Sequence, residues 1–466
     1  MMTDLNDIRF DLPFSQEAIE QTRLATDTRV AAFAHDRLDL RGKTVLAFKY
    51  NGGCDCAFSI SRVYDGFLLG VHIIDADEFV CAGTPLDIEA AARFSSCNIV
   101  GKTHTLLPQR LINGALGYAE GQDRLAVSVI MTVDGYGVLK DIDLQKSIVR
   151  ASIVCDYDEI DAFYKGTDRS ELIWIVEKYA AFKGEIEMMY DLGARLHAAR
   201  RRAGAAEYSE YDTVTEYAAD GSVVAMTRAE RESDSGRLIT EFLLYAGCMT
   251  ARLLNSHGFP NIYTRCDAMS QEDARFLARL SGLDMPDGDL DREAAQRELA
   301  AHISLHSKQQ VLAAEYFAAM PEPYYSDEYG RNCALGITGY MRICHPTCNY
   351  PDLIGQRIIK SWIRSGGSVS NIDTNRHKRI IAALLPMFNA KMHLIDRARR
   401  EVFERDLAQL VRTGDLDAYY MGDARILLQC GAYGILHGKT NAAPLDRIKV
   451  AVQDPERMIF VSRETF

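Results

Sequence analysis

The chain has 466 residues, of which 47% are hydrophobic and 25% charged. This composition is typical of a globular protein and argues against a disordered or low-complexity chain. The formal net charge of -12 argues against an openly basic surface that coats nucleic acid, although a strand can still be held in a local basic channel.

The start of the chain and its cysteines predict a reduced, cytoplasmic protein. Residues 1–14 have neither the basic nor the apolar segment of a secretory signal, and no stretch reaches the roughly 18 uncharged apolar residues that a membrane helix needs. The eleven cysteines are an odd number spread over a long chain, which is unlike a secreted disulfide framework.

The N-terminal part of the chain predicts a short lead-in followed by β-rich sequence. One helix is expected from Ser15 to about Ala34. Short β-rich runs then occupy residues 43–50, 57–64, 67–74, 124–133 and 147–154. Asp134-Gly135 predicts a hairpin turn between two of these segments.

The middle and the end of the chain change from helical to β-like sequence. A helix is predicted from Glu185 to Arg202, and a second hairpin turn at Asp220-Gly221. Apolar residues at three- and four-residue spacing then predict helices at residues 237–256, 271–282, 291–319, 352–365 and 375–409. From Leu416 onward the tail is β-like again.

These elements predict an α+β protein with three parts. The parts are a lead-in (1–40), a large body (41–395), and a helix with a small β-rich C-terminal domain (396–466).

Blocks of sequence in the body resemble the RNB family of ribonucleases, which includes RNase II and RNase R. They are GVHIIDADEFVCAGTPLDIEAAARFSS (70–96), LLPQRLINGALGYAEGQDRLAVSVIMTVD (106–134), ITEFLLYAGCMTARLLNSHGFPNIY (239–263) and ALGITGYMRICHPTCNYPDLIGQRII (334–359). Their order and spacing are family-like from about residue 10 to 395.

The resemblance implies a fold and an activity. The implied fold is a mixed β-sheet core with surrounding helices, and the β-rich tail would be a reduced S1/OB-like barrel. The implied activity is that of a processive 3′→5′ exoribonuclease, in which RNA threads to aspartates that hold magnesium and an arginine assists at the phosphate.

The family's metal ligands are mostly absent from this sequence. Where the family has an Ile-Asp followed by Asp-x-Asp-Asp, this chain has VLAFKYNGGCDCAFSISR (45–62), in which only Asp55 matches. Gly53 and Cys56 stand at the flanking aspartate positions. Several carboxylates are needed to hold two divalent ions over a phosphodiester. The magnesium pair, and hydrolysis that depends on it, are therefore predicted to be absent or altered.

The arginine of the family motif is absent as well. Where the family has Ser-Pro-x-Arg-Arg-Tyr, this chain has HPTCNY at residues 345–350. Arg342 lies close in sequence and is the candidate to replace the missing guanidinium.

The resemblance implies that these two altered segments face the same pocket, which leaves three alternatives open. One is a zinc site formed by Cys54, Cys56, Cys344 and Cys348. Another is an altered catalytic site, with a histidine-activated cysteine, formed by Asp55, Cys56, His345 and Cys348. The third is that the cysteines are simply small buried hydrophobic residues.

Other residues are candidates for contacting RNA, by stacking, by phosphate contacts or by matching an acidic family position. They are Tyr340, Tyr350, Arg342, Arg200, Arg201 and Glu241. Core packing is the alternative for the tyrosines, and a solvated helix end is the alternative for the arginines. His72 and Asp75 are expected to have structural roles.

The sequence thus predicts an RNA-binding protein that has lost the two-metal exoribonuclease site. The expected partner is single-stranded RNA or a tRNA 3′ end, rather than DNA or a membrane. The alternatives are an enzyme that acts on RNA through a Cys/His pocket, and an active 3′→5′ exoribonuclease whose metal ligands come from elsewhere in the chain.

Overall fold

The computed structural model describes most of the chain, and its N-terminal helix differs from the prediction. The described residues are 12–23, 27–50, 53–99, 102–166, 173–205, 211–230, 233–411, 415–455 and 457–463. Two helices, α1 (Gln16–Thr22) and α2 (Asp27–Ala32), replace the single helix predicted from Ser15 to Ala34. In the last turn of α1 the Thr22 hydroxyl donates to the Ile19 carbonyl oxygen at 2.6 Å, and such bonds weaken a helix.

A mixed seven-stranded sheet forms the centre of the molecule, in the order β1-β8-β7-β4-β3-β2-β9. Its strands are β1 (Leu38–Asp39), β2 (Leu46–Tyr50), β3 (Gly53–Val63), β4 (Gly66–Ile74), β7 (Asp123–Val133), β8 (Leu139–Arg150) and β9 (Ile153–Cys155). The edge strands β1 and β9 pair in parallel with β8 and β2, and the other neighbours are antiparallel. The predicted turn between β7 and β8 is confirmed, because Asp134 accepts hydrogen bonds from the amides of Tyr136 and Val138.

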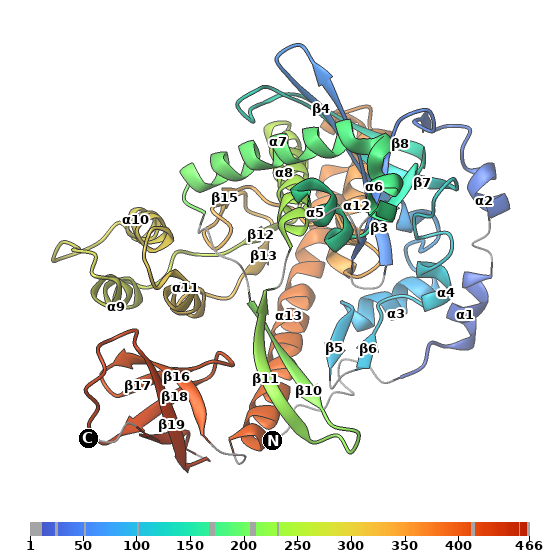
Figure 1. Cartoon of the computed structure of the whole chain (residues 1–466). Helices are drawn as coiled ribbons and strands as arrows, with labels where there is room; N and C mark the ends of the chain where they lie inside the picture. The colour runs from blue at the N-terminus through green and yellow to red at the C-terminus, as the bar shows by residue number, and fades with distance from the viewer. Residues whose placement is uncertain are drawn as a thin grey trace.

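Helices and short strands surround this sheet. They are η2 (Ala76–Glu78), α3 (Pro85–Arg93), β5 (Cys97–Ile99), β6 (Lys102–His104), α4 (Gln109–Ile112), α5 (Tyr157–Lys165), α6 (Ile173–Tyr179), η3 (Ala180–Phe182), α7 (Lys183–Arg202), α8 (Asp234–Ser256) and α12 (Tyr350–Arg364). Figure 1 shows α7 and α8 near β4 and β8, and α7 contacts β3 while α8 contacts β4 and β8. These contacts bury one face of the strands that carry the candidate site.

A group of three helices follows α8, and here the sequence prediction was wrong. The elements of this region are β12 (Tyr263–Arg265), α9 (Gln271–Ser281), α10 (Arg292–Ser304), α11 (Gln309–Ala318), β13 (Tyr324–Ser326), β14 (Arg331–Asn332) and β15 (Ile337–Thr338). The single helix predicted over 291–319 is divided into α10 and α11. At the break, the Lys308 amide donates to His306 Nδ1 at 3.0 Å.

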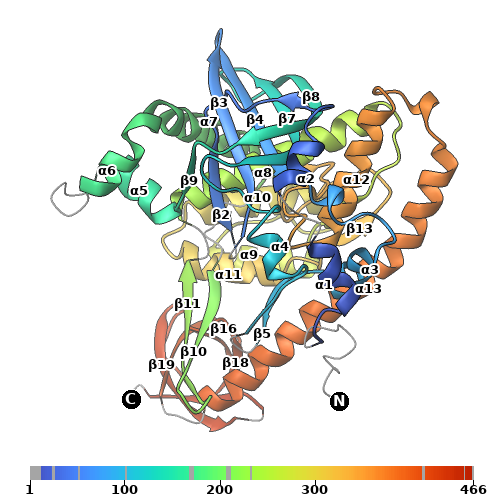
Figure 2. The same cartoon turned by 90° about the vertical axis from the view of Figure 1, so that its right-hand side faces the viewer.

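The longest helix, α13 (Thr374–Leu410), joins the body of the molecule to its C-terminal part. It follows η4 (Val369–Asn371), has 37 residues and contains Pro386. It agrees with the helix predicted over 375–409. At 1.5 Å per residue it is about 55 Å long, and Figure 2 shows it running from the body down to the barrel. The domain boundary proposed between residues 395 and 396 falls inside this helix.

A closed five-stranded barrel ends the chain, in the order β16-β17-β18-β20-β19. Its strands are β16 (Leu416–Gly422), β17 (Arg425–Leu428), β18 (Tyr433–His437), β19 (Arg447–Asp454) and β20 (Ile459–Ser462). The order, with β18 and β20 parallel, is that of an OB-type barrel. The predicted β-rich tail is thereby confirmed, as is the α+β fold class.

The barrel is held between two other parts of the chain (Figure 1). The hairpin of β10 (Tyr211–Tyr217) and β11 (Val223–Glu230), with its predicted turn at Asp220-Gly221, shares a hydrophobic cluster with the barrel and with the end of α13. A second cluster joins the barrel to α9, α10 and α11. None of the helices in the described parts of the chain is long and apolar enough to cross a membrane.

Candidate site around Asp55 and His345

The candidate site forms where β3 meets the turn that precedes α12. Cys56 on β3 is paired with Phe48 of β2 and Ile73 of β4, so this end of β3 lies inside the sheet. The turn is closed by hydrogen bonds from the amides of Cys348 and Asn349 to the His345 carbonyl oxygen, at 3.0 and 2.9 Å. Segments almost 300 residues apart in the sequence are therefore adjacent in the fold.

The turn is also held by hydrogen bonds to neighbouring segments of the body. The Ser96 amide donates to the Cys348 carbonyl oxygen at 2.7 Å, and the Tyr350 amide donates to Phe94 at 2.8 Å. The His345 amide donates to Asp352 Oδ2 at 2.8 Å. These bonds set the position of the His345 side chain relative to β3.

Asp55 is buried and has partners on both carboxylate oxygens. Its relative exposure is 2%. The Thr347 hydroxyl donates to Oδ2 at 2.5 Å, and His345 Nδ1 lies 3.1 Å from Oδ1. Burial alone would lower the pKa of the His345 imidazole, but the Asp55 carboxylate outweighs burial and raises it. The predicted meeting of the two altered segments is thus present, as a contact between Asp55 and His345.

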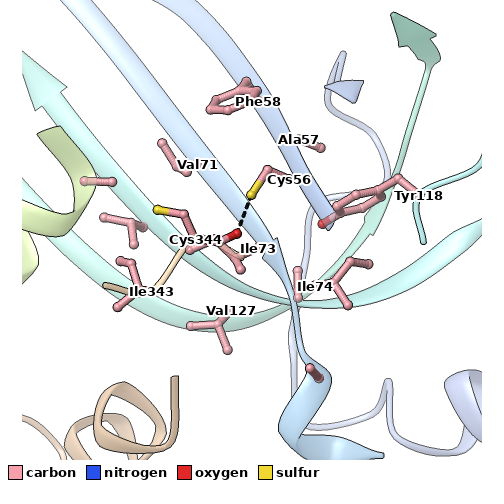
Figure 3. Packing of buried hydrophobic residues seen from close by; sticks show 14 of the residues in the cluster. Cys56, Ala57, Phe58, Val71, Ile73, Ile74, Tyr118, Val127, Ile343 and Cys344 are labelled. Atoms are coloured by element: carbon pink, nitrogen blue, oxygen red, sulfur yellow. Dashed lines mark hydrogen bonds between the residues drawn. The ribbon is translucent and has the colours of Figure 1, made fainter. Parts of the chain in front are cut away.

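The cysteines of the two segments are buried, protonated thiols. Figure 3 shows Cys56 and Cys344 among apolar side chains, with Cys56 Sγ donating to the Cys344 carbonyl oxygen at 2.6 Å. Burial raises the pKa of Cys54 and Cys348 to about 12, and it raises that of Cys56 and Cys344 well above the usual value. Because the thiolate is the nucleophile, these values weigh against the predicted histidine-activated cysteine.

The structure brings together a different set of metal-ligand atoms from the predicted four cysteines. In the described part of the chain, Asp55, Cys56 and His345 form one group of possible metal ligands. Their donor atoms all lie within 4.8 Å of one another. This set does not fit the magnesium pair that the family resemblance implies. Magnesium prefers several oxygen ligands in octahedral geometry, and here a single carboxylate stands beside a thiol and an imidazole.

Arg342, the candidate to replace the family's arginine, is paired within the chain. Its Nε donates to Asp352 Oδ1 at 2.8 Å, and its side chain retains 35% exposure. The carboxylate of Asp352 raises the pKa of Arg342 well above its usual value. The guanidinium is therefore charged and partly accessible, but its charge is already balanced by Asp352. Its predicted contact with phosphate stays a prediction.

The two tyrosines predicted to stack on RNA bases differ in their surroundings. Tyr350 is 4% exposed, donates to Asp87 Oδ1 at 3.2 Å and packs against Phe388, which favours the core-packing alternative. Tyr340 is half-buried, and its ring lies so close to α8 that a Cβ at Gly247 would meet it at 2.7 Å. The close approach of the two requires glycine at position 247.

Two of the residues predicted to contact RNA, Arg200 and Glu241, belong to an ion-pair cluster between α7 and α8, and their contact with RNA stays a prediction. Glu241 is buried and accepts hydrogen bonds from His197 Nδ1 at 2.7 Å and Arg200 Nη2 at 2.5 Å. Burial opposes ionisation of Glu241, but these bonds outweigh it and lower the pKa. Arg200 and Glu241 therefore join α7 to α8. Arg201 lies at the exposed end of α7, with Ser304 Oγ at 3.5 Å from its Nη2.

Sequence reasoning missed Thr347 and Asp352, which hold the site residues in place. Their signal was present in the family-like motif at 345–353, where Asp352 precedes a leucine as in the family. The structural roles expected for His72 and Asp75 are confirmed. His72 bonds to Ser59 and Ser128, and Asp75 accepts hydrogen bonds from Arg37 and Lys360.

The chain thus combines a mixed sheet with covering helices, an OB-type barrel, and a buried aspartate, Asp55, on β3. The RNB domain model matches residues 37–365. The chain therefore belongs to the RNB domain family.

Two curated bacterial ribonucleases are similar in sequence to this chain. Ribonuclease R of Thermotoga maritima is 24% identical over 401 residues, covering 84% of this chain and 56% of that protein. Ribonuclease R 1 of Lactococcus lactis is 25% identical over 369 residues, covering 77% of this chain and 44% of that protein. The chain thus spans about half the length of these curated relatives.

Solved structures confirm the fold. Mycoplasma genitalium RNase R, in complex with ribose-methylated single-stranded RNA, matches with a TM-score of 0.81 and 15% identity, over 98% of this chain and 76% of that chain. Yeast Ssd1, described as a pseudonuclease, matches with a TM-score of 0.65 and 15% identity, over 92% of this chain and 53% of that chain.

Proposed function

We propose that the chain is a pseudonuclease of the RNB family. It binds a single-stranded RNA end, such as a tRNA 3′ end, in the cytoplasm, and it does not bind DNA or associate with membranes. It does not hydrolyse the bound RNA with magnesium. The observation that carries this proposal is the state of Asp55, which is 2% exposed and engaged on both oxygens by Thr347 and His345.

The chemistry of phosphodiester cleavage supports the loss of hydrolysis. Two ions that clamp the attacking and leaving oxygens need several carboxylates in one place. Here the positions beside Asp55 are Cys54 and Cys56, and Gly53 precedes them. Freeing Asp55 for an ion would also break its hydrogen bonds with Thr347 and His345.

Features of the chain and of its relatives support RNA binding. Mycoplasma genitalium RNase R has been solved with single-stranded and with double-stranded RNA, and a pseudonuclease with this fold has been solved as well. Because the net charge is -12, contacts to RNA phosphates are local. Neutralising those phosphates releases counterions, so the affinity falls as salt rises.

The test is a cleavage assay and a band-shift run on the same samples. Purified full-length protein is incubated with a 5′-labelled single-stranded RNA and Mg²⁺ or Mn²⁺. We expect a shifted band with intact RNA, and weaker binding at higher salt. Asp55→Asn is the matched control, because it removes the remaining carboxylate charge at nearly constant size.

The curated ribonuclease R relatives favour a second candidate, an active 3′→5′ exoribonuclease. A ladder of 3′-trimmed products that EDTA and Asp55→Asn both abolish would establish that candidate and refute the pseudonuclease. A ladder that survives in Asp55→Asn would come either from metal ligands elsewhere in the chain or from a contaminating nuclease. Absence of any shift at low salt would refute RNA binding.

A further inference from the structure

The donor atoms around Asp55 suit a metal ion that the RNB resemblance does not imply. A carboxylate, a thiol and an imidazole are the ligand types of zinc, which tolerates sulfur and nitrogen where magnesium demands oxygen. We propose that Asp55, Cys56 and His345 bind one zinc ion, with the fourth coordination position left to water or another small ligand. The inference does not depend on RNA binding.

The distances in the cluster are close to those of a zinc site. With Zn–N and Zn–O bonds of about 2.0 Å and a Zn–S bond of about 2.3 Å, tetrahedral donors lie about 3.3–3.6 Å apart. The donor atoms of the three residues all lie within 4.8 Å of one another, and the Asp55–His345 pair is already at 3.1 Å. Forming the site would draw these donor atoms closer together and would release Cys56 Sγ from the Cys344 carbonyl oxygen.

The ligands come from two elements whose backbones are already fixed. Asp55 and Cys56 lie on a strand paired on both sides, and His345 lies in the turn held by Ser96 and Asp352. The Thr347 hydroxyl donates a hydrogen bond to Asp55 Oδ2, and this bond directs Oδ1 toward His345. Neighbouring bonds of this kind orient ligands in metal sites.

The charges of the proposed ligands suit a doubly positive ion. Zinc is bound by a carboxylate, a deprotonated thiol and a neutral imidazole, so two negative ligands would face Zn²⁺. This balance avoids the cost of an unpaired charge in the interior.

The side chain of His345 keeps the site reachable. It retains 13% exposure, whereas the side chain of Asp55 retains 3%. A zinc site with three protein ligands and one open position can bind an exogenous ligand, whereas a structural site with four protein ligands is closed. In either state the ion would tie β3 to the turn before α12.

The experiment is a metal analysis of the full-length protein without a histidine tag. The protein is treated with EDTA, loaded with ZnCl₂ and gel-filtered in metal-free buffer that contains excess Mg²⁺. We expect about one zinc per chain, as the stated site requires. Cys56→Ser and His345→Gln should each bind zinc at least about tenfold more weakly. Cys81→Ser, which removes the exposed cysteine outside the cluster, should bind normally.

A second readout does not depend on the variants' folding. Wild-type protein loaded with Co²⁺ should show a thiolate-to-cobalt charge-transfer band and tetrahedral d–d absorption. Zinc far below one per chain together with the absence of these bands would overturn the proposal. Loss of zinc in Cys348→Ser would overturn the open fourth position. The band-shift assay is separate, so the two proposals can fail independently.

Discussion

At His72 the sheet buries an imidazole that is neutral at physiological pH. Its Nε2 lies 2.9 Å from Ser59 Oγ and its Nδ1 lies 2.7 Å from Ser128 Oγ, and the residue is 1% exposed. No carboxylate bonds to either nitrogen, since both are occupied by hydroxyls. Burial therefore lowers the pKa of His72 to about 4.

This burial predicts a loss of stability in mild acid. In the unfolded chain the imidazole takes up a proton below its ordinary pKa of 6.5, whereas the folded imidazole stays neutral down to about 4. The contribution is fully present above pH 6.5 and is lost as the pH falls toward 4, by about 3 kcal/mol in total. Urea unfolding at several pH values, followed by tryptophan fluorescence, measures it.

The matched variants are His72→Gln and His437→Gln. His72→Gln should remove this acid-dependent component, whatever it costs at neutral pH. His437 is exposed at the end of β18, so its replacement should leave the pH dependence unchanged. An equal acid loss in wild type and His72→Gln would contradict the assignment.

Among the elements, α7 and α8 are joined by a buried ion-pair cluster. Glu241 on α8 faces Arg200 and His197 on α7, and its side chain is 6% exposed. Arg200 also donates to the Leu335 carbonyl oxygen at 3.0 Å, which extends the connection to the segment before β15. This cluster fixes the helix pair that covers β3 and β4.

Replacing the carboxylate should therefore weaken the helix pair. We expect Glu241→Gln to lower the free energy of unfolding by about 2–3 kcal/mol, because Arg200 loses its charged acceptor in a largely buried position. The control is Glu187→Gln on the neighbouring helix α7. Glu187 pairs with Lys183 at 3.7 Å in an exposed position, where such pairs contribute less than about 1 kcal/mol. Similar effects of the two substitutions would refute the role of the cluster.

The elements also show where sequence reasoning succeeds and where it stops. The long helix α13 and both hairpins were predictable because periodicity and turn residues act locally. The break between α10 and α11 was not, since apolar spacing continues through it and His306 closes it by a side-chain bond. The meeting of Asp55 with His345 came from the family resemblance. The altered catalytic site predicted from the sequence already grouped Cys56 with this pair, whereas the predicted zinc site of four cysteines did not.

In the whole molecule, the barrel packs against the helices α9, α10 and α11 through the face that OB-type barrels use for oligonucleotides. That face is formed by strands equivalent to β17 and β18. Here Arg425 of β17 lies over the rings of Phe276 of α9 and Tyr433 of β18, at 4.8 and 5.3 Å. Its guanidinium lies 3.5 Å from the buried Glu315 of α11. The barrel thus contacts the body through aromatic and basic residues, which are of the kind that bind oligonucleotides in other OB-type barrels.

Arg425→Ala tests whether this contact between the barrel and the helices stabilises the protein. It removes the partner of Glu315, a carboxyl whose pKa burial already raises, and it removes two ring contacts. We expect a loss of about 1–2 kcal/mol in stability, with RNA affinity unchanged below the melting temperature. Arg447→Ala, on the exposed side of β19, is the control and should alter neither. Weaker RNA binding with unchanged stability in Arg425→Ala would assign this face to RNA instead.

The length of α13 determines how far the barrel moves when the helix bends. Phe388 packs against Tyr350 at 6.2 Å, next to the turn that carries His345, and Pro386 lies two residues before Phe388 in the helix. Leu407, in the barrel cluster, is about 28 Å further along the helix. A pivot of about 10° at the proline therefore carries the barrel end through about 5 Å while Phe388 barely moves. The two hydrophobic clusters that attach the barrel to the rest of the chain therefore limit how far the barrel end of α13 can swing.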